Sequence, residues 1–329
     1  MSKIEAPKTY QGADLENIFF RPMFTGPDAQ DLGIRIMYNM PVPTTLQFWK
    51  RSGDILHKYT SSGWKGGTAA SRYSKQITLS KVKAEASYSA SDYFNMVYEV
   101  ITNRSDVNLQ DLSGTELEEA ETALFKEAIA ESIRATMWLG DTARSSSSAQ
   151  YNTFDGFLIR IMTDISLGET DIKQTSFTDS TKPASAEAIL KGLWDNASTS
   201  LKDCKSQGNL VYLVTSDIYN DYEEALDSVV VESAYLAKQN GRQGISYRGI
   251  PVIDLQLSAY LPSFTSLPQT FGILTDRRNL ALAVNTKDFP GTEVKMWYNP
   301  DLMQNRQRAV FMAGCDYLLP ELISFTYKS

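Results

Sequence analysis

The stretch TFGILTDRRNLALAV, residues 270–284, places the charged segment Asp276–Asn279 between two apolar runs. Phe271–Leu274 and Leu280–Val284 are rich in strand-forming residues, and Asp276–Asn279 separate them. The pattern predicts a hairpin of two strands joined by a charged turn. Such a turn is either part of an active site or part of a contact surface. Patterns elsewhere in the sequence are needed to distinguish these two roles.

The residues on both sides of this stretch alternate between strand and helix patterns. In chain order we predict a helix from Ser185, a strand over Leu210–Thr215, a helix over Ser216–Leu226 and a strand over Ile250–Leu255. Further strand patterns follow at Val294–Tyr298, at Ala309–Ala313 and in YLLPELISFTY. The second half of the chain therefore has the rhythm of an α/β unit.

The clearest helix pattern lies in the middle of the chain. Ser113 and Thr115 each stand three residues before a glutamate, which is the spacing of a capping box. Apolar residues then recur at spacings of three, four and seven as far as Leu139. We predict a helix over Thr115–Leu139, roughly 35 Å long at 1.5 Å per residue.

A projecting segment is predicted before this helix. Ser61–Ser74 is rich in Gly, Ser and Lys, and Gln76–Ala86 alternates apolar and polar residues with one phase slip. We interpret Phe48–Ala86 as a long two-stranded projection with a flexible tip. Trp64 lies on that tip, where an exposed aromatic side chain is costly, so we expect it to contact a partner.

The N-terminal residues show neither a helix nor a strand period. Met1–Leu32 mixes proline and glycine with scattered aromatic residues, and we predict an extended arm. Phe19, Phe20 and Phe24 make this arm too apolar for a solvated tail. We therefore expect these side chains to lie on another surface, which we interpret as that of a neighbouring molecule.

Composition excludes several classes of protein. The 329 residues are 42% hydrophobic, enough for a core, and the net charge of −7 argues against a dedicated nucleic-acid binder. The N-terminus has no signal-peptide pattern, and no window approaches the ~20 apolar residues of a membrane span. Cys204 and Cys315 are predicted to be two buried free thiols in an intracellular protein.

No arrangement of residues for catalysis emerges. His57 is the only histidine, which excludes zinc sites built on several histidines, and it reads as a surface residue. Asp217, Asp221 and the glutamates after them follow a helix start, so we interpret them as a solvated acidic face. GWKGG at residues 63–67 lacks the spacing of a phosphate-binding loop. We predict no catalytic residue, cofactor site or metal site.

Four segments carry a resemblance to a known family. They are VYLVTSDIYNDYEEAL (211–226), YRGIPVIDL (247–255), FGILTDRRNLALAV (271–284) and MWYNPDLMQNRQRAVFMAGCDYLLPELI (296–323). In this order, and with the arm, projection and long helix before them, they resemble the major capsid proteins of tailed double-stranded-DNA bacteriophages. The resemblance implies the α+β Hong Kong ninety-seven capsid fold.

The resemblance also implies a division of the chain. Residues 1–32 would be the N-terminal arm and residues 48–86 the extended β-hairpin loop. Residues 33–47, 87–183 and 286–329 would form the peripheral domain, with Thr115–Leu139 as its spine helix. Residues 184–285 would form the α/β axial domain.

The function implied by the resemblance is structural. The chain would self-assemble into hexamers and pentamers of an icosahedral shell around the phage DNA, which is enclosed without specific binding. It would have portal and scaffolding or decoration proteins as partners and no membrane. It would be part of the virion, assembled in the host bacterial cytoplasm. Arg277 and Arg278 would then form a subunit contact or support one. Lys65 lies in the loop region from which some family members cross-link, but no motif assigns that bond.

Three alternatives stay open at this point. The first keeps the fold and makes the chain the shell of an encapsulin-like bacterial nanocompartment. The second is an α/β enzyme that uses the acidic helix after Thr215. The third is another virion structural protein, such as a tail or decoration protein, which the long helix and the α/β second half disfavour.

Overall fold

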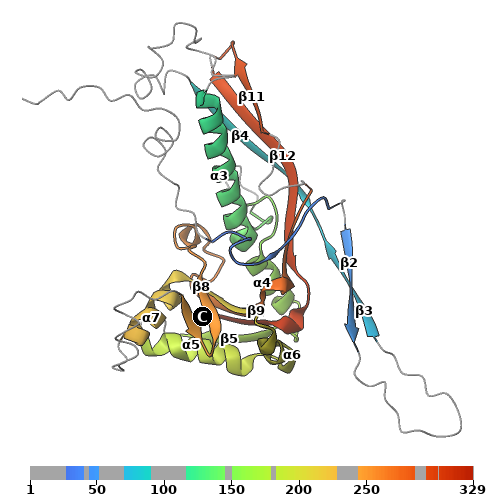
Figure 1. Ribbon diagram of the computed structural model, residues 1–329, viewed down its shortest axis with the longest axis vertical. Helices are drawn as coiled ribbons and strands as arrows, with labels where there is room; N and C mark the ends of the chain where they lie inside the picture. The colour runs from blue at the N-terminus through green and yellow to red at the C-terminus, as the bar shows by residue number, and fades with distance from the viewer. Residues whose placement is uncertain are drawn as a thin grey trace, which may run out of the picture.

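The computed structural model describes residues 27–40, 44–51, 70–89, 116–144, 150–178, 183–227, 244–285, 294–302 and 304–328. Their helices and strands form an α+β fold with two larger sheets and one two-stranded sheet (Figure 1). The predicted fold class is confirmed.

The larger sheet forms the lower part of the molecule in Figure 1. Its strand order is β5-β13-β9-β6-β8-β7, made of Lys173–Phe177, Ile323–Lys328, Phe271–Asp276, Leu210–Val214, Ile250–Asp254 and Ile245–Tyr247. Helices α5 (Pro183–Asn196) and α7 (Ser216–Asp227) cover one face, and their apolar side chains form one core with that face. The central strands β6 and β9 are buried throughout. The predicted α/β rhythm is confirmed.

The second sheet is elongated and carries the long helix. Its path is β1-β10-β12-β11, with β4 also paired to β12; these strands are Arg35–Met37, Leu280–Val284, Gln304–Tyr317, Val294–Asn299 and Ser80–Ser89. Helix α3 (Glu116–Leu139) lies along β4 and β12 in Figure 1. The predicted long helix is therefore confirmed to within one residue.

The predicted hairpin of residues 271–284 is wrong. Strand β9 pairs with β6 and β13, whereas β10 pairs with β1 and β12 in the other sheet. The intervening 3-10 turn η3 (Arg277–Asn279) carries the chain from one sheet to the other. Because both strands are buried on both faces, their apolar runs specify a strand but not its partner.

A two-stranded projection leaves the body of the molecule, as the sequence indicates (Figure 1). It pairs β2 (Thr44–Arg51) antiparallel with β3 (Ala70–Ile77), so that Leu46 lies opposite Lys75. The prediction that Gln76–Ala86 forms its second strand is largely wrong, because β4 begins at Ser80 and pairs with β12 in the second sheet. Gly314 permits this crossing, since a Cβ there would lie 2.3 Å from the carbonyl oxygen of Thr78.

A second close crossing joins α3 to helix α4 (Phe157–Ser166). A Cβ on Gly156 would lie 2.7 Å from the backbone of Trp138, and one on Gly140 would lie 2.2 Å from the carbonyl oxygen of Phe154. The rings of Trp138 and Phe157 then meet edge to face at 5.3 Å between centroids. The short elements that remain are α6 (Thr199–Asp203), η1 (Cys204–Gln207), η2 (Leu261–Ser263) and η4 (Pro320–Leu322).

The predicted domain boundaries remain predictions, but two observations bear on them. Strands β5 and β13 fall outside residues 184–285, yet they pair in the same sheet as β6 and β9. Ala29 and Leu32 fall inside the predicted arm, yet both are buried in the core that α3 and α4 share. The last residues of that arm thus pack as part of the folded body.

Candidate subunit-contact site

The turn after β9 is organised by a buried carboxylate. Asp276 accepts hydrogen bonds from the backbone nitrogen of Arg278 at 2.9 Å and from its guanidinium at 3.0 and 2.6 Å. The Asp276 side chain is 3% exposed and that of Arg278 is 57% exposed. Arg278 also donates to Oε1 of Gln207 at 2.6 Å. Arg278 is therefore an exposed cation whose guanidinium is held in a fixed orientation by Asp276 and Gln207.

Arg277 is half-buried and packs against Gly33, in the segment that enters the fold. Its Cδ would lie 3.1 Å from a Cβ on Gly33, which has the left-handed φ of +68°. Its backbone nitrogen donates to the carbonyl oxygen of Asn209 at 3.0 Å. We expect substitution of Gly33 to disturb this contact, because both the φ angle and the space favour glycine.

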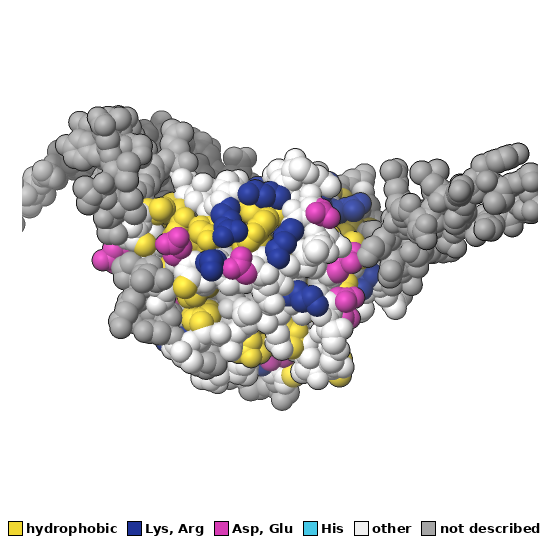
Figure 2. Space-filling view, turned by 90° about the horizontal axis from the view of Figure 1, so that it is seen from below, with side chains coloured by type: hydrophobic (Ala, Val, Ile, Leu, Met, Phe, Trp, Pro, Cys, Tyr) yellow, Lys and Arg dark blue, Asp and Glu magenta, His cyan; other side chains and the backbone are white. Residues whose placement is uncertain are grey.

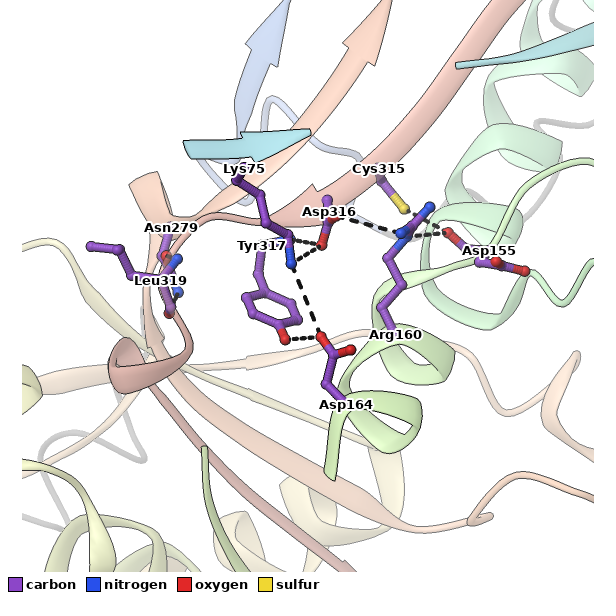
Figure 3. A network of polar contacts seen from close by, with 9 residues as sticks. All are labelled: Lys75, Asp155, Arg160, Asp164, Asn279, Cys315, Asp316, Tyr317 and Leu319. Atoms are coloured by element: carbon purple, nitrogen blue, oxygen red, sulfur yellow. Dashed lines mark hydrogen bonds and ion pairs between the residues drawn. The ribbon is translucent and has the colours of Figure 1, made fainter. Parts of the chain in front are cut away.

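Asn279 links the two connections at which the chain passes from one sheet to the other, β9 to β10 and β12 to β13. Its side chain donates to the carbonyl oxygen of Leu319 at 3.0 Å and accepts from the Leu319 nitrogen at 2.8 Å (Figure 3). Its own carbonyl oxygen accepts from the nitrogen of Leu318 at 2.9 Å. Residues 318 and 319 lead from β12 to β13, so the two crossings are fixed side by side.

A polar network next to this junction holds the base of the projection. Lys75 of β3 lies 3.4 Å from Oδ1 of Asp316 and 4.0 Å from Oδ2 of Asp164, and its Nζ lies 4.4 Å from the centroid of the Tyr317 ring (Figure 3). The Tyr317 hydroxyl donates to Asp164. Arg160 of α4 lies 3.4 Å from the other oxygen of Asp316. The network thus joins β3, α4 and β12.

The charge state of this network follows from burial. Burial raises the pKa of Asp316 above its ordinary value, although Arg160 and Lys75 oppose the shift. Burial also raises the pKa of Cys315, whose thiol contacts the carbonyl oxygens of Asp155 at 3.2 Å and Met137 at 3.5 Å. A wholly buried thiol of this kind is a packing residue and not a nucleophile.

A third polar cluster joins α3 to the segment after β8. Arg134 donates to both oxygens of Glu131, at 2.8 and 2.6 Å, and to the carbonyl oxygen of Leu255 at 2.9 Å. The hydroxyl of Tyr260 donates to Glu131 as well. These groups are buried, so the long helix and the lower sheet are connected by a desolvated ion pair.

The predicted contact residues fall in two groups. Arg277 and Arg278 are adjacent in the turn, where Arg278 is exposed and Arg277 is partly covered. Phe19, Phe20, Phe24, Trp64 and Lys65 lie outside the described residues, as does His57. Cys204 and Cys315 are both free, and Cys315 is buried as predicted, but the predicted burial of Cys204 is wrong, because its side chain is only half-buried.

The network residues Lys75, Asp316 and Asn279 were not predicted from the sequence. Lys75 and Asp316 are far apart in the chain, and no spacing rule connects them. Glu131 and Arg134 were recognisable, because they stand three apart in a helix segment whose other residues are mostly apolar.

Within the described ranges, no group of three or more His, Cys, Asp or Glu side chains is arranged to bind a metal ion. None of the described helices has the length and hydropathy of a membrane span.

Comparison with known proteins relates the chain to solved structures alone. No family model matches the sequence, and no curated protein matches it. A chain of the capsid of a native GTA particle matches with a TM-score of 0.59 at 11% identity, over 99% of this chain and 96% of that one.

Phage structures match over similar shares of the chain. The satellite phage P4 procapsid gives a TM-score of 0.56 at 10% identity, over 89% of this chain and 92% of that one. The capsid of Myoviridae phage XM1 gives 0.54 at 12% identity, over 94% of each chain. The chain therefore has the fold found in phage capsids.

Proposed function

We propose that this chain, which has the fold of phage capsid proteins, is a major capsid protein. In this proposal it assembles into the hexamers and pentamers of an icosahedral shell that encloses double-stranded DNA. The observation that carries the proposal is the extent of the likeness, which spans nearly the whole chain and nearly the whole of each matched chain.

The form of the molecule supports assembly over catalysis. An isolated pair of strands is marginally stable in water, and this projection leaves the folded body, so we infer that it gains stability by lying on another molecule (Figure 1). Lys75 fixes the base of this projection to Asp316 and Tyr317. We infer that this network sets the direction in which the projection reaches its neighbour.

The enzyme alternative receives no support from the acidic helix. Asp217 accepts hydrogen bonds from the hydroxyls of Thr215 and Thr270, so it serves as a fixed acceptor at the start of α7. A general base would instead present to the substrate a carboxylate oxygen that is able to accept a proton. The structural likeness also favours a shell protein, and we assign the chain no catalytic activity.

The contact residues are part of the proposal. Phe19, Phe20 and Phe24 of the arm and Trp64 and Lys65 of the loop would lie on adjacent subunits. Arg278, exposed and oriented by Asp276, would contact a neighbour, while Arg277 would support the turn from within. Portal, scaffolding or decoration proteins would join the particle, which would form in the host cytoplasm.

Light scattering on the size-exclusion eluate tests the proposal, with negative-stain images of the heaviest fraction. We expect rings of five or six subunits or closed shells. A stable monomer of 36.8 kDa at every concentration, with no assembly beside a scaffolding protein, would overturn it.

The solved structures named above are phage and GTA capsids, so they favour a virion over a nanocompartment. DNA within native particles, in place of a cargo enzyme, would decide that choice.

A further inference from the structure

Two cations converge on a single indole ring at the lower face of the molecule. Trp194 lies in the last turn of α5, with Nζ of Lys205 5.3 Å and Cζ of Arg248 5.9 Å from its ring centroid. Arg248 also lies 5.5 Å from the centroid of Tyr247. Aromatic faces attract cations, so the rings hold both charges at the surface.

Arg248 occupies a backbone conformation that usually belongs to other residues. It has a φ of 53° and Gly249 a φ of 78°, in the two-residue turn that joins β7 to β8. Asn and Gly adopt this conformation with less strain than a long side chain. An arginine kept at a strained position, with its guanidinium exposed, points to a use for that charge.

Further cations extend this surface. Lys202 donates to the carbonyl oxygen of Asp195 at 2.9 Å, and Lys191 lies 3.5 Å from the Asp195 carboxylate. We call Lys191, Trp194, Lys202, Lys205 and Arg248 the basic patch. Figure 2 shows Lys and Arg side chains gathered around hydrophobic ones on this face. Within the part of the chain that the structure describes, no carboxylate pairs with Lys205 or Arg248.

The same chain carries a surface of opposite charge. Asp217, Asp221, Glu223 and Glu224 of α7 form what we call the acidic face. Glu223 and Glu224 are exposed and make no ion pair among the described residues. One oxygen of Asp221 is buried without a hydrogen-bond partner in those residues. Burial, with the charges of Asp217 and Glu224, raises the pKa of Asp221, and no cation among the described residues opposes this shift.

We propose that the basic patch of one subunit binds the acidic face of the next subunit around the ring. This inference rests on the proposed function and names the partner surface within it. A closed ring with head-to-tail contacts needs two different, complementary surfaces on each subunit. Lys205 and Arg248 stand before the first residues of β6 and β8, whereas Asp217 follows the last residue of β6. The acidic face then continues along α7 past Tyr222, whose ring lies 6.1 Å from that of Tyr247, so it is a separate surface on the helix next to the basic patch.

Paired charge reversals test this contact. One variant carries Lys205→Glu with Arg248→Glu, and the other carries Glu223→Lys with Glu224→Lys. Because like charges then face each other, we expect each variant alone to need about tenfold more protein to form rings, or more. All four substitutions in one chain should restore both five- and six-membered rings.

An equal mixture of the two variants gives a sharper result. Each contact in an alternating ring then joins opposite charges, so six-membered rings should return. Five-membered rings should not, because an odd ring cannot alternate. The control for the basic-patch variant is Lys81→Glu with Lys126→Glu, which makes the same change in net charge as that variant at exposed positions of β4 and α3 outside both surfaces.

The outcomes separate this inference from the proposed function. Absence of rings from the unmodified protein would refute the proposed function. Rings from both reversed variants at the unmodified protein's concentration would overturn only this contact, as would equal loss in the control. Circular dichroism checks folding, and Lys205→Gln with Arg248→Gln replaces any basic-patch variant that unfolds. If the basic-patch variant assembles normally but loses retention of a double-stranded DNA fragment, the patch binds DNA and the inference is wrong.

Discussion

Arg134 forms a buried ion pair that joins α3 to the segment after β8. Its side chain is 3% exposed and that of Glu131 is 7% exposed, so both charges have lost their water. Four hydrogen-bond acceptors surround the guanidinium, two on Glu131 and the carbonyl oxygens of Leu255 and Gln256. A pair of this kind is costly to break from one side, because the remaining charge stays buried without a partner.

Arg134→Met is therefore expected to destabilise the folded subunit strongly. We expect the free energy of unfolding of the unassembled subunit to fall by about 3–5 kcal/mol, measured by urea denaturation. Adding Glu131→Leu should recover most of this loss, since no unpaired charge then remains. A single variant as stable as the unmodified protein would mean that the pair is solvated and does not join α3 to the lower sheet.

Glu131 should also make stability depend on pH. Burial raises its pKa, but hydrogen bonds from Arg134 and Tyr260 and the charge of Arg134 outweigh this, so the pKa lies below its ordinary value of 4.5. Its contribution is then complete above about pH 4.5 and is lost as the pH falls through the lower folded value. Urea midpoints between pH 7 and pH 3 should decline less steeply in Glu131→Gln. Parallel curves for the two proteins would contradict this assignment.

At the scale of elements, the positions of helices and strands were largely predictable and their pairing was not. The α3 pattern predicts both ends of the helix, because caps and apolar spacing are local signals. Strands β9 and β10 were also found, but as a hairpin. Their partners depend on Asp276, which caps the 3-10 turn, and on Asn279, which binds residue 319 of a distant segment.

The crossing of α3 and α4 depends on Gly156. Gly156→Ala places a methyl group 2.7 Å from the Trp138 backbone, so we expect a loss of about 1–3 kcal/mol in the free energy of unfolding. Gly192→Ala in α5 is the matched control. Open space surrounds that position, and helix propensity should raise stability by about 0.5–1 kcal/mol. Equal effects at both glycines would show that the crossing tolerates a side chain.

Lys75 governs the base of the projection in this account. Lys75→Met keeps the length of the side chain and removes its charge, so it loses Asp316 and the contact with the Tyr317 ring. We expect the free energy of local opening of β2 and β3 to fall by about 1–2 kcal/mol, seen as faster amide hydrogen exchange there and not in β6. Lys81→Met on the exposed side of β4 should leave exchange unchanged. If amide exchange in β2 and β3 of Lys75→Met were unchanged, the polar network around Asp316 would not stabilise the projection.

At the scale of the whole molecule, the order of parts in the sequence was the most informative signal. A projection, a long helix, an α/β unit and returning strands were all predicted in that order, and the fold they indicated is confirmed. The proposed contact residues were predictable only in part. Arg278 stood out as a charged residue in a turn, whereas the basic patch joins residues from α5, α6, η1 and the β7–β8 turn that no local pattern connects.

Deleting residues 1–26 tests the role proposed for the arm. We expect the remaining chain to fold with nearly unchanged stability, because the buried residues Ala29 and Leu32 are kept. It should not form shells, since the apolar side chains of Phe19, Phe20 and Phe24 are lost to the neighbouring subunit. Circular dichroism and negative-stain images report the two properties separately. Normal particles from the shortened chain would refute the role of the arm.

The central claim is that copies of this chain close into a shell, and cryo-electron microscopy of the heaviest fraction tests it most directly. We predict particles with five-fold and six-fold rings, in which the density of each subunit fits the two sheets, α3 and the β2–β3 projection. Open filaments, or a homogeneous solution of 36.8 kDa monomers at every concentration tried, would contradict the account.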